Sequence, residues 1–465
     1  KIKHKVFILT KHYFVKYKLF IMMTTLMSQE IPNEFFEFKQ DKILNDSGDN
    51  WGVLSTFGPL RHDSDGFKSD SLMVRSRFGA KFSYKNKVLY AYGHFTFKNY
   101  FHGYLYPRIV TNPNSVDRFT GVPRDIKRRG FSAGETDLSG ITFERDWIMF
   151  QFGRGRQSWG AGNNIQLAVS ETSPAYDYGM IDLNFSNLRV RYFHGYLESD
   201  SSQNNRYING RGVEFKNNKN FIIGLSEIII YSGENRNLDY AYLNPISTHL
   251  EIELNQRQNL EGNDSGNGVW QISIDYLSPK KNRFSFNYMF DEFILDKSQL
   301  IDGKERFNAY SFKIVKNIFK SNSRIVSTYL SRAMIGKNTF RHEDGSNNFV
   351  QRNKPLGHFL GSDFEITEIG LSSLINQNLI ISIQLGRKEQ GNNSILNKPY
   401  NSYNFNYDVS EGREITTFLR SETQLWYNKK YSIFLNNEYA FNSSTKPDIS
   451  LEIGFDIYAN ILTTL

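Results

Sequence analysis

Cysteine is absent from the 465 residues of this sequence. Its absence excludes a disulfide framework, a thiolate metal site and a cysteine nucleophile. Long apolar runs are also missing, because beyond residue 27 no stretch approaches the roughly 20 apolar residues of a membrane-spanning helix. If the mature protein lies in a membrane, it must therefore cross it as a closed β-barrel, whose strands satisfy every backbone hydrogen bond.

Aromatic residues, by contrast, are abundant, at 15% of the chain, although the mean hydropathy is only -0.51. A chain that is rich in rings yet polar on average is unusual for a soluble enzyme. The formal net charge is +8. This charge is compatible with a nucleic acid, a membrane surface or an acidic polysaccharide as partner.

The N-terminal region has the pattern of a secretory signal peptide, with Lys11, Lys16 and Lys18 before an apolar run at 19–27 and then Ser28. The alternative is the start of a buried apolar helix. We expect residues 1–28 to hold the signal peptide and an upstream extension, and residues 29–69 to form a short periplasmic or plug segment. Residues 70–465 are expected to form one barrel.

From about residue 70 onward, runs of roughly ten residues alternate between apolar and polar and are separated by turns rich in Asn, Gly, Asp and Ser. Period-2 alternation indicates β-strands with one apolar face. In VWQISIDYL (269–277) and RFSFNYMF (283–290), for example, every second residue is aromatic or aliphatic. The rings on the apolar face, the charges on the other and the continuation of the pattern favour an outer-membrane barrel over a soluble secreted β-protein. The sequence predicts an all-β, antiparallel transmembrane barrel of about 18 strands.

The stretch FQFGRGRQSWGAGNN, residues 150–164, combines glycines, two arginines and a tryptophan. It lacks the third glycine of GxGxxG, the Gly-Lys-Ser/Thr of a P-loop and the GxSxG of a nucleophile elbow. The residues suit a strand end followed by a tight turn at the barrel rim, with Trp159 anchored at the interface or stacked on a sugar.

The surrounding line DWIMFQFGRGRQSWGAGNNIQLAVSETSPAYDY (146–178) resembles the signature of the capsule-assembly Wzi family of outer-membrane proteins. YLNPISTHLEIELNQ (242–256) and NKPLGHFLGSDFEITEIGLSS (353–373) resemble later stretches of Wzi-like proteins. The resemblance implies one barrel of eighteen strands that holds capsular polysaccharide at the cell surface. It implies a lectin-like function, neither an enzyme nor an export channel.

Arginines on the polar faces offer independent support for an acidic glycan, because guanidinium groups bind carboxylates bidentately. If the aromatic face points to lipid, Arg75, Arg77, Arg189 and Arg191 point into the lumen; Arg154 and Arg156 share one side of their segment. Inward-facing Glu422, Glu452 and Asp456 leave a second interpretation open, in which lumenal ion pairs fill the barrel. The candidate polysaccharide-binding residues are Arg75, Arg77, Arg154, Arg156, Gln157, Trp159, Arg189 and Arg191.

Other functions have weaker support. HDSDG at 62–66 lacks the remaining ligands of a calcium loop, and the nine histidines form no HExxH motif, so we expect no metal and no cofactor. An exterior Ser-His-amide site, as in an outer-membrane phospholipase, would leave no motif.

In a secreted barrel the aromatic side chains face lipid and do not stack on bases, so we expect no nucleic acid as partner. We expect a monomeric, non-catalytic protein whose partners are acidic surface polysaccharide, outer-membrane lipid and lipopolysaccharide. A diffusion porin or substrate-specific channel is the alternative.

Overall fold

The computed structural model describes Thr56 and residues 72–83, 87–98, 101–112, 123–126, 131–145, 147–199, 203–217, 219–255, 257, 266–291, 308–376, 378–402, 412–427, 431–442 and 447–462. The predicted signal peptide (1–28), the HDSDG motif and most of the 29–69 segment lie outside these residues. Among the described residues, no helix has the length and apolarity needed to cross a membrane.

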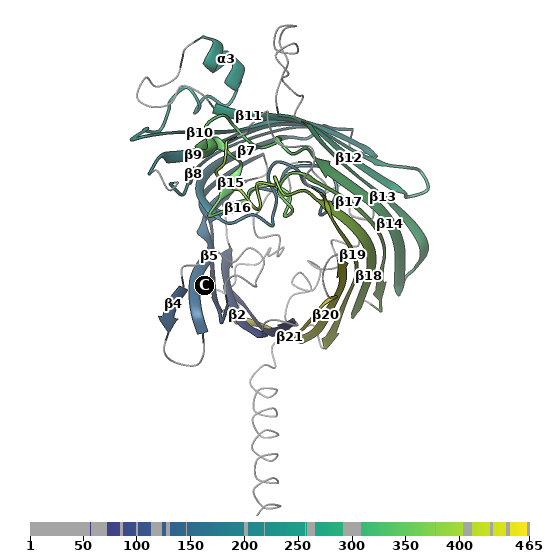
Figure 1. Ribbon diagram of the computed structural model, residues 1–465. Helices are drawn as coiled ribbons and strands as arrows, with labels where there is room; N and C mark the ends of the chain where they lie inside the picture. Colours follow the sequence, from purple (N-terminus) through teal and green to yellow (C-terminus); the bar gives the residue numbers. More distant parts are fainter. Residues whose placement is uncertain are drawn as a thin grey trace, which may run out of the picture.

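The strands are those of an all-β protein (Figure 1). The first half comprises β1 Leu72–Ser83, β2 Lys87–Lys98, β3 Phe101–Val110, β4 Pro123–Ile126, β5 Phe131–Glu144, β6 Ile148–Gly155, β7 Tyr176–Phe185, β8 Leu188–Leu197, β9 Asn205–Lys216 and β10 Phe221–Gly233. The second half comprises β11 Gly266–Leu277, β12 Arg283–Phe290, β13 Asn308–Ser321, β14 Arg324–Ile335, β15 Val350–Gln351, β16 Lys354–Pro355, β17 Phe364–Ile375, β18 Leu379–Gln390, β19 Glu414–Tyr427, β20 Tyr431–Asn442 and β21 Asp448–Leu462. The helices are α3 His249–Leu254 and the 3₁₀ turn η3 Gly345–Asn347.

Eighteen of these strands form a closed antiparallel barrel, which confirms the predicted fold class. Chain order is kept around the ring, with β4, β15 and β16 outside the series, and β21 closes the ring by pairing with β1. The register of this closure places Arg77 opposite Asp456 and Phe78 opposite Phe455. A closed ring leaves no unpaired strand edge, as a membrane barrel requires.

The predicted alternation is confirmed along the strands. Large apolar side chains such as Phe284, Leu451 and Ile453 are exposed on the outer face, whereas Ser285 and Asp456 on the opposite face are buried inside the barrel. The connections alternate as well, between short turns such as 186–187 and long segments such as 234–265. The long segments 111–130 and 391–413 lie at the same end of the barrel as 234–265.

Three of the long segments, 156–175, 336–363 and 391–402, fold into the barrel and pack on one another. The Ser170 N–H donates to Leu356 O at 3.0 Å, and the Gly391 N–H donates to Asp363 O at 2.8 Å. Their apolar side chains, including Leu167 and Phe349, join inward residues of the strands in one core cluster. These segments, which we call the plug loops, fill part of the lumen; β15 and β16 are drawn inside the ring in Figure 1.

Candidate functional site

The 150–164 stretch begins on strand β6 and ends in the first plug loop. The predicted strand end is confirmed at Gly155, but the chain then turns into the lumen instead of staying at the rim. Asn287, on the inner face of β12, accepts the Ala161 N–H at 2.7 Å and donates to Ala161 O at 3.0 Å. The glycine-rich turn is therefore held against the inner wall.

Trp159 has no exposed surface. Its indole N–H donates to Gln157 Oε1 at 3.1 Å, and its ring packs edge-on against Phe193 at a centroid distance of 5.2 Å. Gln157 is buried beside it. Contrary to expectation, the indole offers no face to a sugar or to the membrane interface, because the plug loop folds it into the core.

Arg154 and Arg156 do not share one side of their segment as predicted. Arg154 pairs with Asp177 at 3.3 Å, and the Asp177 side chain is 65% exposed. Arg156 is buried; it contacts Asp137 and donates from Nε to Ser173 O at 2.5 Å. Asp137 also accepts from Arg108 Nη1 at 2.8 Å. The turn after Gly155 separates the two guanidinium groups, one at the surface and one in a buried ion-pair set.

Arg189 and Arg191 face the lumen, as predicted, but both bind the same carboxylate. Arg189 Nη2 lies 2.7 Å from Asp182 Oδ2, and Arg191 Nε contacts the same oxygen. All three side chains are buried. In this part of the barrel, the second interpretation, in which lumenal ion pairs fill the barrel, therefore fits the structure better than a glycan contact does.

Arg77 is different, because its side chain keeps 23% of its surface exposed. Its Nε lies 3.2 Å from Asp456 Oδ1, and its guanidinium lies 4.0 Å from the centre of the Phe434 ring. The side chain of Arg75, although its backbone belongs to β1, lies outside the described residues. Polysaccharide binding by any of the eight candidates stays a prediction.

The Phe434 contact belongs to a repeated arrangement on the inner wall, which we call the glycine–ring–cation stacks. Each ring lies opposite a glycine of the neighbouring strand, and a cation covers its other face. The pairs of ring and glycine are Phe434 with Gly454, Phe418 with Gly386, and Tyr329 with Gly370. A Cβ atom at any of these glycines would lie 2.2 to 2.3 Å from ring atoms, so a larger residue would displace the ring.

The cations of the three stacks are Arg77, Arg420 and Lys313. Arg420 lies 4.2 Å from the centre of the Phe418 ring, and Lys313 lies 4.6 Å from that of Tyr329. Cation–π contacts of this kind contribute roughly 0.5–1 kcal/mol at exposed sites and hold the charged group in place. The flat rings therefore position the cations toward the interior of the barrel.

Two carboxylates lie next to Arg420 on the inner wall. Arg420 Nε donates to Glu438 Oε2 at 3.0 Å, and its Nη1 lies 3.8 Å from Glu368. The Arg420 side chain is 28% exposed. Phe418 and Phe434 are themselves buried, so the partly exposed guanidinium groups above them are the part of each stack that can bind a carboxylate bidentately. The stacks are thus the candidate glycan site that the structure offers.

The stacks were not predicted from the sequence. Inward positions of β19 and β20 could be read from the alternation, as Glu422 was, but Phe418 and Phe434 are aromatic residues on the polar face. Only the register places each of them beside a glycine. The signal in the sequence is an aromatic residue at a position that the alternation assigns to the polar face, because such a residue points into the lumen.

No protein-family model matches the sequence, and no curated protein does either. Among solved structures, the chain is similar to Wzi of Escherichia coli, described as an outer-membrane protein involved in group 1 capsule assembly and a carbohydrate-binding β-barrel. The TM-score is 0.60 at 11% identity over 84% of each chain. OccAB1 of Acinetobacter baumannii is more distant, with a TM-score of 0.45 and 8% identity over 85% of this chain and 98% of that one. The likeness to Wzi defines the class: a closed 18-strand barrel of the outer-membrane type.

Proposed function

We propose that this chain is a Wzi-like outer-membrane barrel that binds capsular or other acidic surface polysaccharide and anchors or organises it at the cell surface without catalysis. The plug loops are the observation that carries the proposal. A diffusion channel needs a water-filled path, whereas here three loops and the wall share one apolar core. A lumen that packed loops fill in part favours ligand binding by a fixed surface.

Arg77 and Arg420, the two partly exposed cations of the stacks, supply the chemistry for an acidic glycan, whereas Lys313 is buried. The polysaccharide carboxylates would replace or join the Glu438 partner of Arg420, and the carbohydrate-binding description of Wzi supports the same ligand class.

The proposal also includes export by the 1–28 signal peptide, a monomeric barrel in outer-membrane lipid with lipopolysaccharide, and the 29–69 segment as a plug. The plug role of the 29–69 segment is supported by Thr56, whose Oγ1 donates to Glu214 on the inner face of β9 at 2.8 Å.

The test is polysaccharide retention in a strain that lacks the gene, measured as cell-attached against released acidic polysaccharide, with small-solute uptake recorded on the same cultures. Shedding into the medium with normal uptake is the expected result. Complementation with Arg420→Ala should restore little retention. Arg332→Ala is the matched control, because Arg332 pairs with Glu365 outside the lumen.

A substrate-specific channel remains the second candidate, because Arg420 faces Glu438 and Glu368 across a partly exposed part of the wall. Opposed charged rows of this type line channel constrictions. Normal retention with impaired uptake, together with single-channel conductance of the purified protein in planar bilayers, would overturn the binding proposal in favour of the channel.

A further inference from the structure

The outer face of β8 to β11 changes from apolar to charged along the strands. Two cross-strand rows are wholly apolar: Leu188, Phe215, Ile223 and Ile274, and then Val190, Val213, Leu225 and Ile272. The next row, about 7 Å closer to the long connections, consists of Tyr192, Arg211, Glu227 and Trp270. A charged pair on the outer face of a membrane barrel needs cover, because lipid cannot solvate it.

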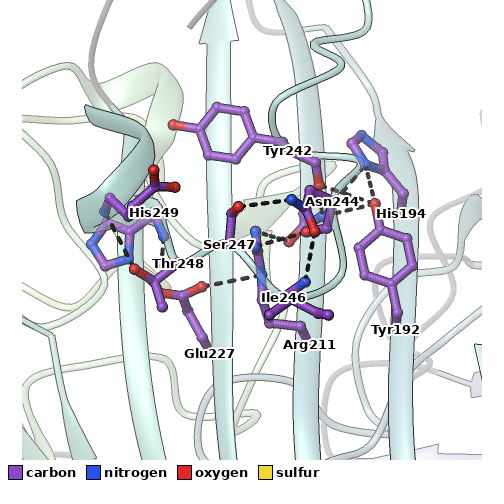
Figure 2. Close-up of polar contacts among 12 residues, drawn as sticks. Tyr192, His194, Arg211, Glu227, Tyr242, Asn244, Ile246, Ser247, Thr248 and His249 are labelled. Carbon is purple, nitrogen blue, oxygen red and sulfur yellow. Dashed lines mark hydrogen bonds and ion pairs between the residues drawn. The ribbon is translucent and has the colours of Figure 1, made fainter. Parts of the chain in front are cut away.

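A segment of the β10–β11 connection, residues 238–255 with helix α3, provides this cover, and we call it the collar segment. Arg211 Nε lies 3.1 Å from Glu227 Oε2, and both residues are buried although their strand positions face outward. Arg211 Nη1 donates to Asn244 O at 3.0 Å. His249 Nδ1 lies 2.6 Å from Glu227 Oε1 (Figure 2).

Tyr242 fixes the N-terminal part of the collar segment to the barrel wall. Its carbonyl oxygen accepts from Tyr192 Oη at 3.0 Å and from Asn209 Nδ2 at 2.6 Å. Its ring stacks on Tyr231 at 4.5 Å, and Tyr231 stacks on Tyr207 at 4.9 Å. The collar segment is therefore bound to the outer wall by hydrogen bonds, a buried ion pair and ring packing, which gives its remaining side chains defined positions.

Two of those side chains are apolar or amphipathic and face away from the protein. Ile246 is 85% exposed and Tyr240 is 84% exposed. Ile246 follows two residues after the Asn244 carbonyl that Arg211 holds, and its N–H donates to Asn244 Oδ1 at 3.0 Å. Ile246 thus lies at the level of the charged row, directly beyond the apolar rows that include Val213 and Leu225.

We propose that the collar segment is a membrane-contact element whose Ile246 and Tyr240 side chains enter the outer leaflet at the boundary between headgroups and acyl chains. The occupant is lipid because the exposed residues continue the apolar band of the barrel wall. Ile246 next to the apolar band and Tyr240 in the stretch that packs beside Tyr231, nearer the end of β10, match the interfacial preference of aliphatic and amphipathic side chains. The inference rests on the membrane location in the proposed function but not on polysaccharide binding.

The absence of cysteine allows a direct test, because each introduced cysteine is the single labelling site. Ile246→Cys, Leu225→Cys and Glu234→Cys would each carry a nitroxide in the full-length protein, reconstituted in vesicles of phospholipid and lipopolysaccharide. Leu225 represents the apolar band, and Glu234 is an exposed residue just before the collar segment. Electron paramagnetic resonance then compares collisions with oxygen, which concentrates in lipid, and with a water-soluble nickel chelate.

The expected result is an oxygen-to-nickel ratio at position 246 that is several-fold above that at 234 and close to that at 225. A ratio equal to that at 234 would overturn the proposal while leaving the membrane location intact. An aqueous ratio at 225 as well would instead refute the membrane location itself. Spin–spin broadening between labels at 246 would identify a second copy of the chain as the occupant and would equally overturn lipid contact.

Discussion

The two sides of the barrel lumen use the same residue types in different ways. On the side of β7 and β8, Asp182 pairs with both Arg189 and Arg191, and all three are buried. On the side of β19 to β1, Arg420 and Arg77 pair with Glu438 and Asp456 but keep part of their surface exposed. Burial therefore separates arginines that hold the wall together from arginines that can exchange a protein carboxylate for a ligand.

This difference has an energetic basis. Removing one partner of a buried ion pair leaves an uncompensated charge and typically costs about 3–5 kcal/mol, whereas a solvent-exposed pair contributes about 0–1 kcal/mol. A ligand can therefore compete for a partly exposed guanidinium at little cost to the fold. Substitutions at the buried ion pairs should therefore lower stability strongly, and substitutions at the partly exposed pairs should change ligand binding.

The largest expected effect is that of Asp182→Ala. The substitution leaves Arg189 and Arg191 facing each other without their shared carboxylate, and we expect the free energy of unfolding to fall by about 3–5 kcal/mol. Urea unfolding in detergent micelles measures the change. Asp177→Ala is the control, because its pair with Arg154 is exposed and the loss should stay below about 1 kcal/mol. Equal losses at the two positions would remove the distinction between buried and exposed pairs.

Trp159→Ala tests the packing of the plug loops against Phe193 on β8. Deleting a fully buried indole leaves a cavity among Phe193 and its neighbours and should weaken loop packing by about 3 kcal/mol. Protease cleavage within residues 156–175 and conductance in planar bilayers should both rise. Trp147→Ala, at an exposed turn, is the matched control. Unchanged cleavage would mean that the loop does not depend on this ring.

The barrel could be predicted from the sequence because period-2 alternation is a local property. Each strand shows its two faces without reference to its neighbours, so the inward direction of Arg77 and Arg191 followed directly. The direction of Arg156 did not follow, because it lies one residue beyond the end of β6, where the alternation no longer applies.

The environment of each inward residue depends on contacts between distant segments. Trp159 looked like a surface ring because nothing near it in the sequence shows that residues 156–175 meet 336–363 inside the barrel. The collar segment was missed for the same reason, since Arg211 and Glu227 interrupt the outward pattern of two different strands. At Arg211 and Glu227 the break in the outward pattern marks a position that a long connection covers.

The pH dependence of loop packing gives a smaller effect. His358 lies in a plug loop between Phe359 and Phe364, its Nδ1 accepts the Leu360 N–H at 3.3 Å, and burial lowers its pKa to about 3. Above about pH 6.5 the imidazole is neutral in both the packed and released loop, so stability does not change. As the pH falls below 6.5, the released loop binds a proton first, and packing should lose about 2 kcal/mol by pH 5.

Loop cleavage by a protease, measured between pH 5 and 7.5, checks this effect. His358→Asn is the matched variant, because the amide oxygen can accept the same N–H but does not titrate. The wild-type cleavage rate should rise as the pH falls, and the ratio of the two rates should become independent of pH above pH 7. A parallel pH response in both proteins would assign the effect to other groups.

The smallest expected effect on the fold, and the one that bears most directly on function, is that of Arg420→Ala. Since the Arg420 pair with Glu438 is partly exposed, the free energy of unfolding should change by less than about 1 kcal/mol. Affinity for an acidic oligosaccharide should fall about tenfold, equivalent to about 1.4 kcal/mol, in titration calorimetry. Arg420→Lys should recover only part of it, because lysine cannot bind a carboxylate bidentately. If Arg420→Ala binds as tightly as the wild type while Arg77→Ala does not, the ligand site lies nearer β1, and the exposed side of the lumen divides further into a binding part and a structural part.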